Sequence, residues 1–176
     1  MKRKSSDPSV IRQRYRRSVL YLTQGALSAA LYVLFTWLSS LFGLASGAIQ
    51  FRLSEGLIIL PLLFAGAVPG LTLGCFLANL LTGATVYDLI FGTLATLIGA
   101  IGARLLRRTH PVLAVLPNIL ANTIIVPLVI LFSAGGEVAF SALPYLCLTV
   151  GAGEVVCGGV LAVALYYVLR RTVHFS

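Results

Sequence analysis

Long uncharged stretches separated by short polar segments dominate the pattern of this chain. No charged residue occurs from residue 18 to 51, and none occurs from residue 56 to 87. A transmembrane helix needs about 20 predominantly apolar residues, because the hydrocarbon core of a bilayer is about 30 Å thick. The pattern predicts six helices, at residues 21–44, 50–67, 69–82, 89–106, 111–132 and 145–169. We therefore expect an all-α membrane protein, a compact bundle of about six transmembrane helices.

The second uncharged stretch is too long for a single helix. One helix over residues 50–84 would be about 52 Å long at 1.5 Å per residue, well beyond the thickness of a hydrocarbon core. Pro69, between Val68 and Gly70, is the expected break, because proline ends helices and suits turns. The helices on its two sides are then both short.

The composition agrees with a membrane protein. Of the 176 residues, 59% are hydrophobic and 10% are charged, whereas a soluble protein usually has about 25% charged residues. These values exclude a soluble cytosolic domain and a disordered chain. Six spans also leave no room for an ATPase or another large catalytic domain, so any energy for transport would come from a partner or an ion gradient.

Basic residues form three clusters that indicate membrane topology. Seven of the 13 lysines and arginines lie in the first 17 residues, three lie at 104–108 and two at 170–171. Short basic clusters beside apolar spans follow the positive-inside rule, which we favour over nucleic-acid binding. An even number of spans separates each cluster from the next, so all three face one side. We expect a multi-pass protein of the cell membrane with both termini cytoplasmic: a tail at 1–17, one transmembrane domain at 18–171 and an end at 172–176.

The sequence indicates neither a catalytic nor a metal centre. The three cysteines have no metal-ligand or redox spacing. The two histidines, His110 and His174, lie beside basic clusters and outside the predicted spans. We therefore expect no cofactor, no metal and no intramembrane enzyme, which would need a nucleophile with a base, or a metal cluster, at membrane depth.

Glu154 is the clearest candidate for a functional residue. A charged side chain within a bilayer is costly and commonly marks a functional site. Glu154 lies ten residues into the sixth predicted helix, and glycines at 151, 153, 158 and 159 surround it. The alternative is a structural hydrogen bond or a protonated carboxyl without a function.

Three asparagines within the predicted spans are further candidates. Asn118 and Asn122 are four residues apart, so they share one face of the fifth helix. Asn79 lies within the third helix. Asparagines can also simply join helices, so each has a structural alternative.

Charged and polar residues near the outer ends of the helices complete the candidate set. Arg52 and Glu55 lie three apart at the start of the second helix, where they could also form an ion pair with each other; Gln50 and Asp88 lie near the outer surface. Together with the buried residues, these groups predict one polar pocket that opens outward. Acceptors and amides suit a neutral or cationic small molecule rich in hydrogen-bonding groups, and the cations are too few for a phosphate or a polyacid.

Small residues on the first helix indicate close helix packing. Ala26 and Ala30 are one turn apart, and Gly25 and Ala29 repeat this spacing on the adjacent stripe. Small residues at this interval allow a second helix to approach closely.

These features together resemble the substrate-binding S components of energy-coupling factor (ECF) transporters. The specific motifs resemble the QueT family of predicted queuosine-precursor transporters. The matching stretches are residues 49–55 (IQFRLSE), 69–70 (PG) with 74–80 (GCFLANL), 88–96 (DLIFGTLAT), 117–122 (PNILAN) and 151–154 (GAGE). They run in order over about residues 24–169, nearly the whole predicted membrane part.

The resemblance implies a mechanism and partners. An S component binds a scarce nutrient from outside and docks on a transmembrane T component with two cytoplasmic ATPases, here with Ala26 and Ala30 as the docking stripe. The implied ligand is a 7-deazaguanine such as preQ1 or queuine. Glu154 would accept from the guanine-like edge, an asparagine or glutamine would serve the carbonyl, and Asp88 or Glu55 would pair with an ammonium. The chain has no Gly-x-x-x-x-Gly-Lys-[Ser/Thr] motif, in agreement with separate ATPases.

Two alternatives remain at this stage. One is an S component for another vitamin-like nutrient. The other is a self-sufficient ion-coupled carrier or channel, which would transport its substrate without ATPase partners.

Overall fold

The computed structural model describes residues 8–43, 51–136 and 138–172. Within these ranges all regular structure is helical and no strand occurs, which confirms the all-α class. The elements are α1 (Pro8–Leu41), η1 (Leu53–Ile59), α2 (Leu60–Leu63), α3 (Ala67–Leu81), η2 (Asp88–Gly92), α4 (Thr93–Leu105), α5 (Pro111–Ser133), η3 (Phe140–Ala142), α6 (Leu143–Glu154), η4 (Val155–Leu161) and α7 (Ala162–Thr172). The elements η1 and η3 are 3₁₀ turns, whereas η2 and η4 are π-helical turns that continue into α-helices.

The elements join into six helical runs, in agreement with the predicted bundle. Four runs in the described part of the chain are long and apolar enough to cross a bilayer: Pro8–Leu41, Asp88–Leu105, Pro111–Ser133 and Phe140–Thr172. Two apolar runs are shorter, Leu53–Leu63 and Ala67–Leu81. The chain is thus a multi-pass membrane protein in which two helices are too short to span a bilayer alone.

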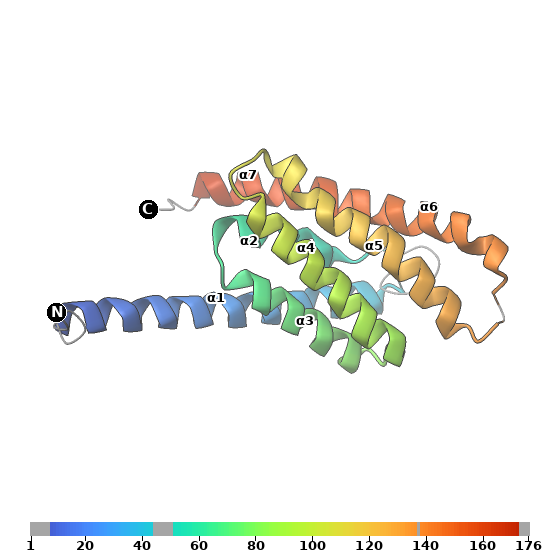
Figure 1. Ribbon diagram of the computed structural model, residues 1–176, viewed down its shortest axis with the longest axis horizontal. Helices are drawn as coiled ribbons and strands as arrows, with labels where there is room; N and C mark the ends of the chain where they lie inside the picture. Colours follow the sequence, from blue (N-terminus) through green and yellow to red (C-terminus); the bar gives the residue numbers. More distant parts are fainter. Residues whose placement is uncertain (1–7, 44–50, 137, 173–176) are drawn as a thin grey trace, which may run out of the picture.

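Helix α1 begins earlier than the hydropathy pattern predicts. The predicted start was residue 21, but the helix starts at Pro8 and contains 34 residues, about 51 Å at 1.5 Å per residue. Proline suits the first position of a helix, and arginine and glutamine are good helix formers. Residues 8–17 are therefore helical and continuous with the first predicted span, and this helix extends beyond the rest of the bundle at its first residues (Figure 1).

The break between the second and third helices lies before Pro69, which corrects the predicted boundary. The chain leaves the helix at Phe64, where the backbone is extended with φ −146° and ψ 140°, and re-enters a helix at Ala67. Pro69 instead occupies the first turn of α3. Proline is tolerated there because the first N–H groups of a helix have no partner within it.

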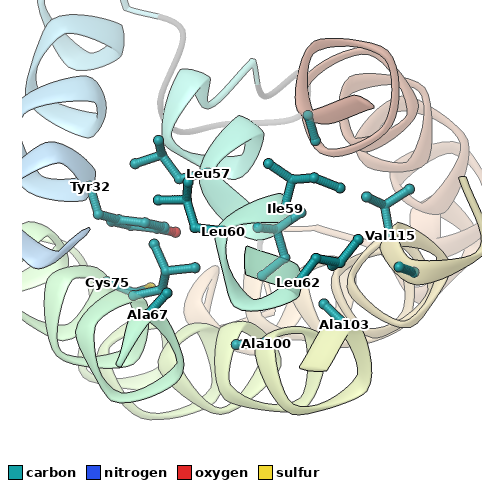
Figure 2. Close-up of a cluster of buried hydrophobic side chains, with 14 of the residues drawn as sticks. Tyr32, Leu57, Ile59, Leu60, Leu62, Ala67, Cys75, Ala100, Ala103 and Val115 are labelled. Carbon is teal, nitrogen blue, oxygen red and sulfur yellow. The ribbon is translucent and has the colours of Figure 1, made fainter. Parts of the chain in front are cut away.

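The short η1–α2 segment forms the centre of the bundle and not one of its outer walls. Residues 54–62 are all buried. Figure 2 shows Leu57, Ile59 and Leu60 of this segment between Tyr32 of α1 and Val115 of α5, and all five belong to one hydrophobic cluster. This central position carries the polar residues at the start of η1 into the protein interior.

Helices α1 and α3 pack closely through small residues. A Cβ atom added to Gly70 would lie 2.9 Å from Gly25 Cα, and one added to Gly74 would lie 2.9 Å from Ala29 Cα. The Gly25 and Ala29 stripe of α1 is therefore used inside this protein. The adjacent stripe, Ala26 and Ala30, is exposed.

The basic clusters gather at one end of the bundle. The start of α1, the turn between α4 and α5, and the end of α7 lie toward the same end (Figure 1). Arg12, Arg107 and Arg170 lie in these three places. This arrangement agrees with the prediction that an even number of spans separates each cluster from the next. The positive-inside rule predicts that this end of the bundle is cytoplasmic.

Candidate functional site

Asn118 joins two carboxyl groups from distant parts of the chain. Its side-chain Nδ2 donates to Glu55 Oε2 at 3.0 Å and to Glu154 Oε2 at 3.2 Å. The exposed fractions are 0% for Asn118, 2% for Glu55 and 8% for Glu154. One amide of α5 therefore connects η1 with α6 in the protein interior. We call Tyr32, Glu55, Asn118, Asn122 and Glu154 the carboxylate cluster.

The two carboxyl groups of this cluster differ in how fully they are bonded. Glu55 Oε1 accepts from the Tyr32 hydroxyl at 2.5 Å, so both oxygens of Glu55 are occupied. Glu154, in contrast, accepts a hydrogen bond of normal geometry from the described residues only at Oε2, where Asn118 donates. The Asn122 amide lies beside the Glu154 carboxyl, but its buried Nδ2 has no hydrogen-bond partner of normal geometry in the described ranges. Glu154 and Asn122 therefore retain hydrogen-bonding capacity.

A second polar group, the arginine cluster, consists of Arg52, Asn79 and Asp88. Arg52 Nη2 donates to Asn79 Oδ1 at 2.7 Å and lies 3.6 Å from Asp88 Oδ2. Asn79 Nδ2 in turn donates to the main-chain oxygen of Asp88 at 3.2 Å. The second carboxylate oxygen of Asp88, Oδ1, is buried without a hydrogen-bond partner in the described structure. Asn79 thus forms hydrogen bonds with both the guanidinium of Arg52 and the main chain of Asp88, the first residue of η2.

The two clusters share one electrostatic environment. Arg52 begins the turn that carries Glu55, and it interacts electrostatically with both Glu55 and Glu154. The combined site contains one cation, Arg52, and three acids, Glu55, Asp88 and Glu154. When all are ionised, two negative charges remain in excess, and unbalanced charge is costly in a protein interior. A cationic or donor-rich ligand would offset this excess.

Two of the three acids, Asp88 and Glu154, lie at π-helical turns. Asp88 is the first residue of η2, and Glu154 directly precedes η4. Turns of this kind are rare and occur frequently at functional sites, because the extra residue changes the direction of nearby side chains. The hydropathy pattern predicted uninterrupted helices at 89–106 and 145–169, with Asp88 just before the first of them, since an apolar run gives no sign of a widened turn.

The structure brings seven of the eight predicted site residues together. Glu154, Asn122, Asn118 and Glu55 lie in the carboxylate cluster; Asn79, Arg52 and Asp88 lie in the arginine cluster. Gln50 lies outside the described residues. The sequence interpretation missed Tyr32, because a tyrosine in an apolar helix is most simply explained by packing. Its bond to Glu55 makes it part of the site.

Two apolar hollows lie near the candidate residues. A pocket of about 360 Å³ lies between the start of the α4 run and α5 and is lined by Tyr87, which directly precedes Asp88 in the chain, and by Phe91, Ile125, Leu128, Val129 and Phe132. A groove of about 610 Å³ runs between α1 and α3, and its lining includes Ala26, Ala30 and Trp37. An apolar pocket beside a few polar groups is typical of small-molecule sites, whereas an open apolar groove with small residues suits a helix.

The functional groups of the candidate site are suited to binding a polar small molecule. They are carboxylates, amides and one guanidinium, which can form hydrogen bonds and charge interactions with a ligand. In the described ranges, no group of three or more His, Cys, Asp or Glu residues could hold a metal ion.

Comparison with known proteins gives two matches. The model of a family described as QueT transporter matches residues 22–171. A protein named queuosine precursor transporter QueT, from Lactococcus lactis subsp. cremoris (strain MG1363), is 38% identical over 73 residues, which cover 42% of this chain and 43% of that protein. The match therefore spans less than half the length of this curated relative. No solved structure matches the chain.

Proposed function

Because the chain belongs to the QueT transporter family, we propose that it captures a queuosine precursor outside the cell as the S component of an ECF-type importer. The proposed ligand is a 7-deazaguanine such as preQ1 or queuine. The ligand class comes from the name of the curated relative, a queuosine precursor transporter. The observation that supports this proposal best is the buried carboxylate cluster, in which Asn118 holds Glu55 and Glu154 on one amide.

Glu154 is the proposed partner of the guanine-like edge. That edge presents two adjacent donors, the ring N1–H and the exocyclic amine, and a carboxylate accepts from both. Glu154 suits this role better than Glu55, because both oxygens of Glu55 already accept hydrogen bonds. The Nδ2 of Asn122 lies beside Glu154 and has no hydrogen-bond partner of normal geometry in the described ranges, so it is the proposed donor to the ligand carbonyl.

The remaining charges favour a cationic substituent on the ligand. The aminomethyl group of preQ1 is an ammonium ion at neutral pH, and it would offset part of the negative excess. Asp88 is the preferred partner, since its buried Oδ1 has no hydrogen bond in the described structure while Glu55 is fully bonded. Arg52 and Asn79 would then hold Asp88 in place.

The groove between α1 and α3 is the proposed docking surface for the T component. Ala26 and Ala30 lie exposed in this groove, and small side chains allow another helix to approach closely. The groove is formed by α1 and α3, whereas the carboxylate cluster draws on η1, α5 and α6 as well as Tyr32. Docking and ligand binding would therefore be separable by mutation. Two cytoplasmic ATPases bound to the T component would supply the energy.

Transport in reconstituted vesicles tests the proposal against its alternatives. Proteoliposomes with the T component and the ATPases should take up labelled preQ1 when ATP is present, and proteoliposomes with this chain alone should not. Uptake by the chain alone would show a self-sufficient carrier. Mass spectrometry of small molecules that co-purify with the chain would separate a 7-deazaguanine from another vitamin-like nutrient.

A further inference from the structure

Gly158 lies next to the atoms through which Asn118 and Glu154 form their hydrogen bond. A Cβ atom added to this glycine would lie 2.9 Å from Glu154 Oε2, 3.2 Å from Asn118 Nδ2 and 3.8 Å from Glu55 Cβ. Real Cβ atoms hardly ever approach another heavy atom within 3.0 Å. The hydrogen bond between Asn118 and Glu154 therefore exists in its present geometry because residue 158 has no side chain.

The neighbouring glycine has no such role. Gly159 lies in the same π-helical turn, η4. A Cβ atom there would lie 3.5 Å from Ile119 Cδ1 and 3.9 Å from the main-chain oxygen of Glu154, both ordinary contacts. The sequence shows several glycines around Glu154, and the structure distinguishes Gly158 from Gly159.

Two further glycines support side chains of the same site. A Cβ atom on Gly92 would lie 2.5 Å from Asp88 Oδ1, and one on Gly99 would collide with Asn118 Oδ1 and lie 2.8 Å from Asn118 Cβ. The missing side chain of Gly99 leaves room for the carbonyl end of the Asn118 amide, while Nδ2 donates to the two carboxylates. At Gly99 a side chain would push against the whole of Asn118. At Gly158 it would first meet the movable end of Glu154.

We propose that Gly158 is a positioning residue of the binding site. Its missing side chain allows Glu55 and Glu154 to share the Asn118 amide and fixes the direction in which Glu154 meets a ligand. This inference rests on the proposed function for its binding consequence, but the shared amide is a property of the free protein. Because the carboxyl end of Glu154 can rotate, a methyl group at residue 158 displaces the carboxylate while the helices stay packed.

The experiment compares Gly158→Ala with Gly159→Ala in the full chain. Isothermal titration in detergent measures binding of preQ1, and thermal melting measures stability. We expect Gly158→Ala to weaken binding at least about tenfold and Gly159→Ala to stay within about twofold of the unmodified protein, as conservative changes away from a site usually do. Both variants should melt as the unmodified protein does.

A second readout requires no ligand. The chain contains three asparagines, so labelling with [¹⁵N]asparagine gives three side-chain amide signals, and Asn118→Gln identifies the one from Asn118. We expect this signal to shift in Gly158→Ala and to stay in place in Gly159→Ala. If the unmodified protein binds no 7-deazaguanine, the proposed function fails, and this signal still decides the role of Gly158.

Other outcomes are equally decisive. An unchanged Asn118 signal in Gly158→Ala, or equal effects of the two glycine changes, would overturn the proposal. If Gly158→Ala does not fold, Gly158→Ala combined with Glu154→Asp provides the test, because aspartate is one methylene shorter and leaves space for the methyl group. Recovery of the fold in the double variant would support the positioning role, and failure to recover would contradict it.

Discussion

Replacing Arg52 with methionine tests whether the single cation of the site balances its acids. Arg52 Nη2 lies 3.6 Å from Asp88 Oδ2 and 2.7 Å from Asn79 Oδ1. At 3.6 Å, two unit charges attract by about 4.6 kcal/mol at an effective dielectric constant of about 20. The side chains are 10% and 19% exposed, so solvent lowers this figure. We expect Arg52→Met to reduce the free energy of unfolding by about 3 kcal/mol, near the lower end of the cost of removing one partner from a buried pair.

A double-mutant cycle isolates the contribution of the pair. Asp88→Asn alone should cost about 1 kcal/mol, because Arg52 keeps its bond to Asn79. The double variant should cost about 2 kcal/mol, so the coupling energy is about 2 kcal/mol, within the range for residues in contact. Unfolding in mixed micelles at rising SDS fractions, followed by circular dichroism, measures these values. Arg107→Met, at an exposed position, is the control and should stay within about 0.5 kcal/mol.

An additive cycle would refute this reasoning. If the two single changes sum to the double change within about 0.3 kcal/mol, Arg52 and Asp88 act independently. Asp88 would then be balanced by another group or by a proton, and its pairing with Arg52 would not stabilise the fold.

Three further predictions concern docking, topology and packing. Ala26→Trp combined with Ala30→Trp should keep ligand binding but lose ATP-dependent uptake and co-purification with the T component, because an indole holds helices apart; normal uptake in cells without the ATPases would end the ECF interpretation. In a chain without its native cysteines, Thr109→Cys should react with a membrane-impermeant thiol reagent only from the cytoplasmic side and Ala134→Cys only from outside; the reverse labelling would contradict the topology. Gly70→Ala should lower the free energy of unfolding by about 1–3 kcal/mol, since its Cβ would meet the main chain of α1; a melting temperature equal to that of the unmodified protein would show that α1 and α3 separate without cost.

The sequence predicted the number and class of the helices better than their ends. Apolar runs and charge clusters determine which segments enter a membrane, so the six runs were found. The start of α1 was missed because hydropathy reports the membrane part of a helix and not its polar continuation from Pro8. The break at Phe64 was missed because tertiary packing sets it: the adjacent Gly66 contacts the main chain of Tyr21 so closely that no Cβ would fit.

The candidate residues could be found from the sequence, but their pairing could not. A charged or amide side chain within an apolar run is costly unless it has a partner, and this rule alone selected Glu154 and Asn118. Their bonds depend on η1, which enters the core and carries Glu55 to them. The hydrophobic periodicity of the sequence does not indicate that η1 enters the core. The π-helical turns and the distinct role of Gly158 likewise arise only when the helices meet.

Isothermal titration of preQ1 into the purified protein and its Glu154→Gln variant tests the central claim most directly. Glutamine keeps the size of the side chain but replaces a carboxylate oxygen with a donor, which faces the donors of the ligand. We expect the unmodified protein to bind and Glu154→Gln to bind at least about tenfold more weakly, a loss of about 1.4 kcal/mol. Thr149→Val, on the same helix, removes a hydroxyl bonded within α6 and should bind normally. Equal affinities of the unmodified protein and Glu154→Gln, or no binding of preQ1 to the unmodified protein, would contradict the account.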